Sequence, residues 1–205
     1  MNFITDKLEE ISWGAALGSD SQALPAFARG RLDNFQWSQV EHPKKGAVGL
    51  FFLLSSQVTG PAKIVLTRRT LTVRTHKGQI GFAGGRAERE DQTPIDTAKR
   101  ELSEELGVGV EHIDDHGLYR SVLSLDGAPV YPVILSARAE NVNLTPQIEE
   151  VAEIYQTAWT SFTRKNDRPF KFNIFGNWRH SNFFTAGEYN VWGLSARILF
   201  NLDLQ

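Results

Sequence analysis

The chain has 205 residues, a formal net charge of −2 at neutral pH and no cysteine. Hydrophobic residues make up 41% of it and charged residues 22%, so the sequence predicts a soluble globular protein and not a disordered one. The nearly balanced charge argues against a general binder of nucleic acid polymers, which carries a broad basic surface. The lack of cysteine excludes disulfides, zinc thiolates and cysteine nucleophiles, and it fits a reducing compartment.

The first 45 residues predict an extension packed on the main domain, which we expect to span residues 46–205. The chain starts MNFITDKLEE, an acidic run without the basic region and apolar stretch of a signal peptide, so we expect a cytoplasmic protein. Apolar residues with rough helical spacing over 3–11 predict a short amphipathic helix. Phe27, Phe35 and Trp37 are expected to pack onto the domain. The extension is also a candidate arm of a homodimer.

Two apolar runs open the main domain. Residues 47–54, AVGLFFLL, form a continuous apolar run that predicts a strand buried on both faces. This run is the longest of its kind in the chain and is far too short to span a bilayer, so we expect no membrane partner. Residues 63–67, KIVLT, predict a second strand after a turn at 59–61.

The later segments carry weaker signals. Hydrophobic patterning predicts strands over 118–125 and 130–137, joined by a turn at residues 126–127. Pro132, inside the second of these strands, indicates an edge strand or a bulge. The remaining predictions are the start of a helix over 158–163, a hairpin or loop over 166–186, and a helix over 188–199.

The clearest local signal is a helix predicted over residues 94–106. Thr93 can cap its first turn, Pro94 fits the first helical position, and Gly107 suits the position after the last turn. An apolar stripe at helical spacing would hold this helix against the domain: Ile95, Ala98, Leu102 and Leu106.

The same helix carries three carboxylates at positions i, i+3 and i+4: Glu101, Glu104 and Glu105. They lie on one side of the helix, beside the apolar stripe, and like charges within one turn repel. One interpretation is a solvated face with an ion pair between Arg100 and Glu104. The other is a site for a hard divalent cation, whose charge would turn the repulsion into a binding term.

A second dense signal lies directly before the helix, over residues 67–85. Basic residues that include Arg69, Arg74 and Lys77 precede a loop that ends in Gly84 and Gly85. Glycines let backbone N–H groups approach an anion, and arginine offers a planar fork to phosphate oxygens. When these residues are taken alone, a solvated loop with a glycine turn is the more frequent explanation. A metal-binding acidic cluster beside anion-binding cations is, however, what a pyrophosphate substrate needs.

Residues 84–108 resemble the signature of the Nudix hydrolase family: Gly, five residues, an acid, a spacer, then Arg-Glu-apolar-x-Glu-Glu-x-Gly-apolar. Here it reads Gly85, Asp91 and then RELSEELGV over 100–108. Asp91 replaces the usual Glu and the spacer is one residue longer, and both features are similar to the coenzyme A pyrophosphatase branch. Residues 66–85 also resemble the additional motif of that branch, with Ala83 in place of the usual Pro.

The resemblance implies a Nudix-type α/β/α sandwich with a mixed sheet. It also implies metal-dependent hydrolysis of a pyrophosphate bond in a nucleoside diphosphate derivative, a small-molecule nucleotide substrate. Coenzyme A is the first candidate, giving 3′,5′-ADP and phosphopantetheine. The alternatives are ADP-ribose or another nucleotide as substrate, or a non-catalytic nucleotide-binding module.

The resemblance also implies roles for residues. Glu101, Glu104 and Glu105 would hold Mg²⁺ or Mn²⁺, and Arg100 would pair with an acid of the signature and orient it. The groups that would meet substrate phosphates are Arg69, Arg74 and Lys77, with Gly84 and Gly85 in the loop.

Two further polar residues are candidates for the site. Glu150 is the candidate for an additional acid near the metals, and a solvated strand entry explains it equally well. His76 could be a catalytic imidazole. A structural hydrogen bond within the loop is the favoured role of His76.

Overall fold

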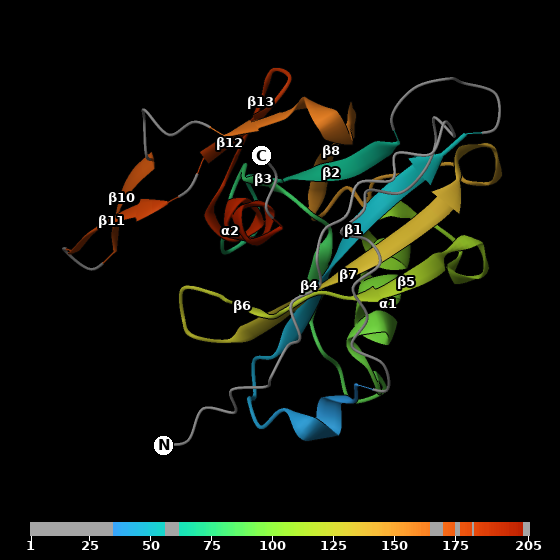
Figure 1. The fold of residues 1–205 in the computed structure, drawn as a ribbon, viewed down its shortest axis with the longest axis horizontal. Coiled ribbons are helices and arrows are strands. Elements are labelled where there is room, and N and C mark those ends of the chain that lie inside the picture. The colour runs from blue at the N-terminus through green and yellow to red at the C-terminus, as the bar shows by residue number, and fades with distance from the viewer. Residues whose placement is uncertain (1–34, 56–61, 165–169, 175–176, 182, 203–205) are drawn as a thin grey trace, which may run out of the picture.

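The computed structural model describes residues 35–55, 62–164, 170–174, 177–181 and 183–202. Its centre is a mixed sheet in the order β3-β2-β1-β7-β5, in which β1 and β7 are parallel and the other pairs are antiparallel (Figure 1). The strands of this path are β1 (Gly46–Leu54), β2 (Lys63–Arg69), β3 (Ile80–Gly81), β5 (Asp114–Leu118) and β7 (Pro129–Arg138). Three further strands pair with it, β4 (Gly84–Arg86) with β1, β6 (Val122–Leu123) with β7, and β8 (Val151–Ala158) with β2.

The apolar run over 47–54 forms β1, and its residues are buried on both faces as predicted. Side chains alternate along a strand, so the run supplies two separate cores. Ala47, Phe51 and Leu53 belong to one core. Val48 and Phe52 belong to the other. The strand predicted over 63–67 is also present, as β2, and it continues to residue 69.

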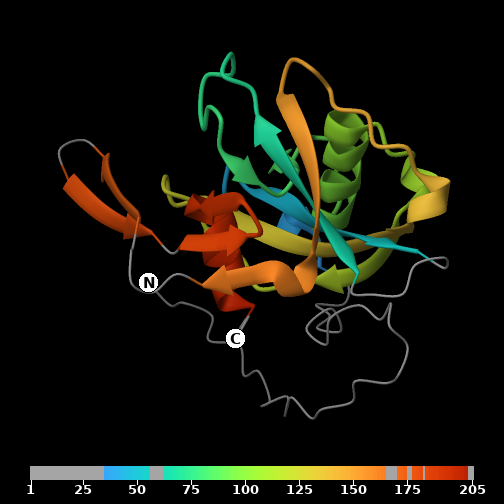
Figure 2. The ribbon, with the colours of Figure 1, turned by 90° about the horizontal axis from the view of Figure 1, so that it is seen from above.

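A helix covers each face of the sheet. Figure 2 shows α1 (Pro94–Leu106) on one side and α2 (Gly193–Asn201) on the other. Ala98 and Leu102 of α1 pack in the core that contains Phe51. Ile198 and Leu199 of α2 pack in the opposite core. The molecule is therefore a helix–sheet–helix sandwich with a mixed sheet, which confirms the expected fold class.

The helix predicted over 94–106 has the predicted ends. The Thr93 hydroxyl accepts a hydrogen bond from the Asp96 backbone N–H at 3.1 Å. The Asp96 carboxylate in turn accepts one from the Thr93 backbone N–H at 2.8 Å. These two bonds form a capping box that satisfies N–H groups of the first turn. Gly107 ends the helix with φ +68°, in the left-handed region that favours glycine.

Two predictions about the strands on either side of the 126–127 turn were wrong. Of the strand expected over 118–125, only Leu118, the last residue of β5, and residues 122–123, which form β6, are in strands. Pro132 lies in β7, which is flanked by β1 and β5 and is therefore not an edge strand, and the irregularity in the β5–β7 pairing falls between Asp115 and Gly117, not at Pro132. The carbonyl of Pro132 accepts a hydrogen bond from Tyr119 N–H at 2.8 Å. The N–H that proline lacks would point the same way, towards the gap between β5 and β6.

The two helix predictions after residue 157 also need correction. Residues 159–161 form a 3₁₀ turn and not the start of an α-helix, and β9 (Phe162–Arg164) follows. Trp159 N–H donates to the Ala62 carbonyl, so pairing with the β2 end of the sheet overrides the local preference. The helix expected from residue 188 begins at Gly193, because residues 189–192 form β13 (Tyr189–Trp192). β13 pairs with β12 (Phe183–Ala186), and β12 pairs with β9.

The hairpin or loop predicted over 166–186 is a hairpin where the structure describes it. β10 (Phe170–Ile174) and β11 (Asn177–Ser181) pair antiparallel. Figure 1 shows this hairpin standing apart from the main sheet, beyond β12.

The described part of the N-terminal extension packs on the domain. Trp37 begins a short 3₁₀ helix over 37–39 and is 3% exposed. Its ring meets the Tyr131 ring edge-on, with the centroids 5.4 Å apart, and it meets the Phe35 ring edge-on as well, with the centroids 6.4 Å apart. Phe27, the helix predicted over 3–11 and the turn at 59–61 lie outside the described residues. The domain boundary at residue 46 and the dimer arm stay predictions.

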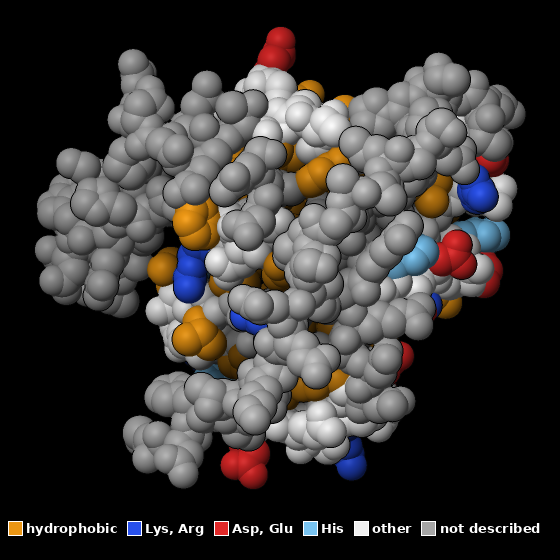
Figure 3. All heavy atoms as spheres, viewed as in Figure 1, with side chains coloured by type: hydrophobic (Ala, Val, Ile, Leu, Met, Phe, Trp, Pro, Cys, Tyr) orange, Lys and Arg blue, Asp and Glu red, His pale blue; other side chains and the backbone are white. Residues whose placement is uncertain are grey.

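The described surface carries both signs of charge. On the face in Figure 3, Lys and Arg side chains lie interspersed with Asp and Glu side chains and with hydrophobic ones. This mixture agrees with the net charge of −2.

Candidate active site

The second half of α1 and the segment before β8 together line an acidic cavity. Glu101, Glu104 and Glu105 reach it from the helix, and Gln147 and Glu150 reach it from the segment. The cavity has a volume of about 310 Å³. The segment is held in place by backbone bonds, in which Gln147 N–H donates to the Glu105 carbonyl at 3.0 Å and Thr145 N–H donates to the Leu106 carbonyl at 2.8 Å.

Gln147 was missed by the sequence analysis. Its side-chain oxygen accepts a hydrogen bond from Glu150 N–H at 2.9 Å, so it both lines the cavity and fixes the backbone of Glu150. The available signal was its place between Pro146 and the acidic pair of residues 149–150. That signal is too weak to single out one glutamine.

Glu105 is the most deeply buried acid of the cluster. Glu105 is 5% exposed. Burial, and secondly the nearby charge of Glu101, raise the pKa of Glu105 to about 8, against the opposing effects of Arg69 and a hydrogen bond from the Gly84 backbone. A carboxyl group held in this way lacks a full counter-charge, and a cation in the cavity would supply one.

Glu101 lies directly against β4. A Cβ atom built on Gly85 would stand 2.3 Å from Glu101 Oε1, so glycine is needed to let this carboxylate approach the strand. Burial raises the pKa of Glu101 as well, against the attraction of Arg100. Gly84 has φ +152° and its Cβ would meet the Ala47 carbonyl oxygen at 2.4 Å. Gly84 and Gly85 belong to β4, which pairs with β1, and they do not form the simple turn that the sequence also allowed.

Arg100 connects the acids of the signature. Its Nη1 lies 3.0 Å from Glu101 Oε1 and 2.9 Å from Glu104 Oε2. Its Nη2 donates to the Arg86 carbonyl at 2.9 Å and to Asp91 Oδ2 at 3.1 Å. The ion pair between Arg100 and Glu104 that the solvated-face interpretation required is thus present, and so is a pairing of Arg100 with acids of the signature.

Asp91 is buried and lies against the guanidinium group of Arg100. It also accepts hydrogen bonds from Glu88 N–H at 2.9 Å and from the Thr97 hydroxyl at 2.8 Å. Burial alone would raise the pKa of Asp91, but the bonds from Arg100, Glu88 and Thr97 outweigh it and hold the pKa below its usual range. Asp91 is therefore an ionised anchor for Arg100.

The basic residues predicted to meet phosphate do not share one position. Arg69 lies at the acidic cavity, with Nη2 3.1 Å from Glu150 Oε2 and Nη1 3.8 Å from Glu105 Oε1. Arg74 and Lys77 are exposed in the loop between β2 and β3, and they form no ion pair with the described residues. Neighbouring Arg68 pairs instead with Glu153.

The loop that carries these residues is tied to α2. Gln79 Nε2 donates to the Trp192 carbonyl at 3.0 Å. The Ser195 hydroxyl accepts from Phe82 N–H at 3.3 Å. His76 Nδ1 lies 2.9 Å from Gln79 Oε1, the structural hydrogen bond that the sequence favoured over a catalytic role. The loop and the C-terminal helix thus hold each other in place.

The donor set of the cavity fits a hard divalent cation, because its four carboxylates and the amide carbonyl of Gln147 offer oxygen ligands. As the side chains stand, no three acidic or imidazole groups in the described ranges surround one point closely enough to hold an ion. Two of the four acids, Glu101 and Glu104, are instead paired with Arg100 Nη1. Burial is the main cause of the raised pKa values of Glu101 and Glu105, and the charges of neighbouring acids raise them further.

The fold and this site define a class of protein: a mixed sheet between two helices, with an acidic helix following a glycine pair. The NUDIX domain profile matches residues 43–175, well over half of the chain. The chain therefore belongs to the Nudix family. A MutT/nudix family protein from Enterococcus faecalis has the same fold, with a TM-score of 0.50 at 15% identity over 80% of this chain and 61% of that one.

The chain is also similar to several curated proteins over two thirds or more of its length. Mitochondrial coenzyme A diphosphatase NUDT8 of Mus musculus is 30% identical over 143 residues, 67% of this chain and 67% of that protein. The protein of the same name from Homo sapiens is 32% identical over 141 residues, 67% of this chain and 60% of that protein. Chloroplastic Nudix hydrolase 22 of Arabidopsis thaliana is 32% identical over 163 residues, 77% of this chain. The chain spans about half of that plant relative, 53% of its length.

A membrane-spanning helix is not found in the described ranges, where every helix is too short or too polar to cross a bilayer.

Proposed function

We propose that this chain hydrolyses the pyrophosphate bond of a nucleoside diphosphate derivative in a reaction that depends on Mg²⁺ or Mn²⁺. The observation that carries the proposal is the cavity where Glu101, Glu104, Glu105 and Glu150 converge beside Arg69. A pyrophosphate needs both a cation site and a fixed positive group, and carboxylates that would hold a cation lie here beside an arginine.

Coenzyme A is the proposed substrate, with 3′,5′-ADP and phosphopantetheine as products. Two observations support it: the similarity to the two coenzyme A diphosphatases and the motif over residues 66–85. Arg74 and Lys77, exposed in the loop between β2 and β3, are available for the additional phosphate of such a substrate.

The side chains at the cavity would have different roles in the reaction. Glu101, Glu104 and Glu105 would hold the divalent ion, which when bound polarises phosphate oxygens and acidifies water. Arg69 would bind and orient the diphosphate from the edge of the cavity. Glu150, half-exposed beside Arg69, can accept the proton of the attacking water. Water attacks phosphorus in line, the new P–O bond forms as the bridging P–O bond breaks, and the other phosphate leaves without a covalent enzyme intermediate.

ADP-ribose is the second candidate, and Ala83 is the observation that favours keeping it. Ala83 is buried next to the glycine pair, and its carbonyl accepts a hydrogen bond from Gly49 N–H at 2.9 Å. Proline would fix φ at this position, so its replacement allows the loop a different shape and a different substrate.

The test is to incubate the purified chain with coenzyme A and Mg²⁺ or Mn²⁺ and to separate the products by chromatography, with ADP-ribose in parallel. Metal-dependent release of 3′,5′-ADP and phosphopantetheine would support the proposal. Turnover of ADP-ribose alone would keep the reaction and replace the substrate. Ligand binding without turnover on either compound would favour a non-catalytic binding module.

The matched variant is Glu105→Gln, which keeps the shape of the side chain and removes its charge. We expect kcat to fall about 100-fold, because a ligand of the ion is lost. Full activity of this variant in the presence of metal would remove Glu105 from the site.

A further inference from the structure

A chain of hydrogen bonds leads from the N-terminal segment to the acidic cavity. The Trp37 indole N–H donates to the Thr97 hydroxyl oxygen at 2.9 Å. The Thr97 hydroxyl donates to Asp91 Oδ2 at 2.8 Å. Asp91 accepts from Arg100, which binds Glu101 and Glu104. These hydrogen bonds thus join the segment before β1 to a distant part of the sequence, the loop before α1 and the first half of α1.

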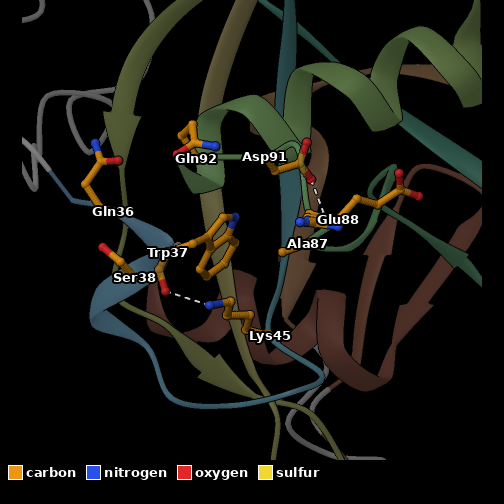
Figure 4. Close-up of a pocket in the computed structure, with 9 residues that line it drawn as sticks. Gln36, Trp37, Ser38, Lys45, Ala87, Glu88, Asp91 and Gln92 are labelled. Carbon is orange, nitrogen blue, oxygen red and sulfur yellow. Dashed lines mark hydrogen bonds between the residues drawn. The ribbon is translucent and has the colours of Figure 1, made fainter.

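The links from Trp37 to Asp91 are shielded from water, whereas the pairs of Arg100 with Glu101 and Glu104 lie at the surface of the cavity. Trp37 is 3% exposed, Thr97 is fully buried and Asp91 is 8% exposed. Hydrogen bonds in such surroundings are directional and are costly to break, because no water can replace the lost partner. Figure 4 shows the Trp37 ring between Lys45 and the start of α1, with Asp91 beyond it at the helix.

The direction of the Thr97 hydroxyl is the decisive detail. The hydroxyl could instead donate to the Thr93 carbonyl, which lies 3.4 Å away in the preceding helical turn. Asp91 is the better acceptor because it is ionised and lies nearer, at 2.8 Å, while the Trp37 indole N–H occupies a lone pair of the same hydroxyl oxygen. The backbone of Trp37 is held as well, because its main-chain N–H donates to the Gln92 carbonyl at 2.9 Å.

We infer that Trp37 and Thr97 are positioning residues of the acidic cavity, which act through Asp91 and Arg100 on Glu101 and Glu104. The inference rests on the proposed metal site. Asp91 Oδ2 receives three donors, from Thr97, Glu88 and Arg100, and Oδ1 receives Arg100 Nε at 3.3 Å. Removal of the Thr97 donor frees the carboxylate to turn and so loosens the arginine that aligns the glutamates.

The inference extends the site beyond the recognised domain. The NUDIX profile begins at residue 43, so Trp37 lies ahead of it. A structural role alone would make Trp37 and Thr97 matter for stability. A positioning role makes them matter for metal affinity and for kcat, even where stability is restored.

The experiment compares four variants by Mn²⁺ binding, followed by electron paramagnetic resonance of the free ion, and by kcat and KM on coenzyme A. Thr97→Val removes the donor to Asp91, and we expect Mn²⁺ affinity and kcat to fall about tenfold, the low end for groups that support metal ligands. Thr97→Ser keeps the hydroxyl and should stay within about threefold of the wild type. Trp37→Phe keeps most of the packing and should lie between the two.

The double variant Trp37→Phe/Thr97→Val separates positioning from stability. It removes both partners of the buried bond, so no indole N–H is left unsatisfied and thermal stability should recover relative to Thr97→Val. We expect Mn²⁺ affinity and kcat to remain about tenfold low, because Asp91 still lacks its donor. Recovery of both together with stability would overturn the inference, as would wild-type affinity in Thr97→Val. A wild-type chain that binds no Mn²⁺ would overturn the metal site and the inference with it.

Discussion

At the scale of single residues, the buried acid Glu105 makes the stability of the protein depend on pH. Its pKa is raised to about 8, chiefly by burial and then by Glu101. Between the ordinary glutamate pKa, about 4.3, and this value, the folded metal-free chain holds a proton that the unfolded chain has released. The free energy of unfolding should therefore fall as pH rises through this window, by at most about 1.4 kcal/mol per pH unit for one group.

Urea unfolding in the presence of a chelator at pH 5, 6, 7 and 8 measures this dependence. The control is Glu105→Gln, which cannot ionise and should show a flatter profile in the same buffers. Glu101 adds to the slope in the same direction, since burial raises its pKa too. A wild-type chain that gains stability from pH 5 to pH 8 in parallel with the variant would contradict the assignment of Glu105.

Arg69 is the second residue with a separable effect. It contacts both Glu105 and Glu150, so it serves the cavity as well as a substrate phosphate. We expect Arg69→Ala to raise KM for coenzyme A about tenfold, and to lower kcat as well, because two carboxylates lose their counter-charge.

Arg68→Ala is the matched control for this prediction. Arg68 is the neighbouring residue on β2 and pairs with Glu153 away from the cavity. Its removal should leave KM close to that of the wild type. Equal KM changes in the two variants would show that general positive charge, and not the position of Arg69, binds the phosphates.

At the scale of elements, the contact between β4 and α1 fixes the cavity wall. An alanine at position 85 would place its Cβ 2.3 Å from Glu101 Oε1, closer than such atoms approach. Gly85→Ala should therefore displace the Glu101 side chain and lower Mn²⁺ affinity about tenfold. Isothermal titration with Mn²⁺ gives the affinity, and circular dichroism checks that the fold is kept. Unchanged affinity in a folded variant would mean that Glu101 has room to move without leaving the site.

The elements that sequence reasoning predicted correctly have local causes. The ends of α1 follow from Thr93, Pro94 and Gly107, which act within one turn of the helix. β1 follows from a continuous apolar run. The segment over 188–199 was misjudged because its first half is fixed by pairing between β12 and β13, a contact between strands that the periodicity of one segment does not reveal.

At the scale of the whole molecule, the site was half predictable for the same reason. The acids of α1 lie at positions i, i+3 and i+4 of one helix, so the sequence alone predicts that their side chains point to the same side. Resemblance to the family, and not spacing, suggested Glu150. Gln147, Thr97 and Trp37 reach the site through tertiary packing. Trp37 stands 60 residues before the threonine that it contacts, and no local pattern encodes that distance.

Metal binding should couple this site to the stability of the entire domain. A ligand that binds only the folded chain stabilises it by about 2.7 kcal/mol at a concentration 100 times its Kd. For a domain of this size that corresponds to a rise in Tm of roughly 5–10 °C. The rise on adding Mn²⁺ should be larger at pH 8 than at pH 6, because at the lower pH the ion must displace the proton that the raised pKa keeps on Glu105.

Differential scanning calorimetry with and without Mn²⁺ at the two pH values tests this coupling, with Glu105→Gln as the control. The variant has no proton to displace at this position, so its smaller rise should depend less on pH. The stabilisation reads out metal binding without any substrate, so it separates the metal site from the choice of coenzyme A. A wild-type chain with the same Tm in chelator and in saturating Mn²⁺ would contradict the metal site, whatever nucleotide the chain hydrolyses.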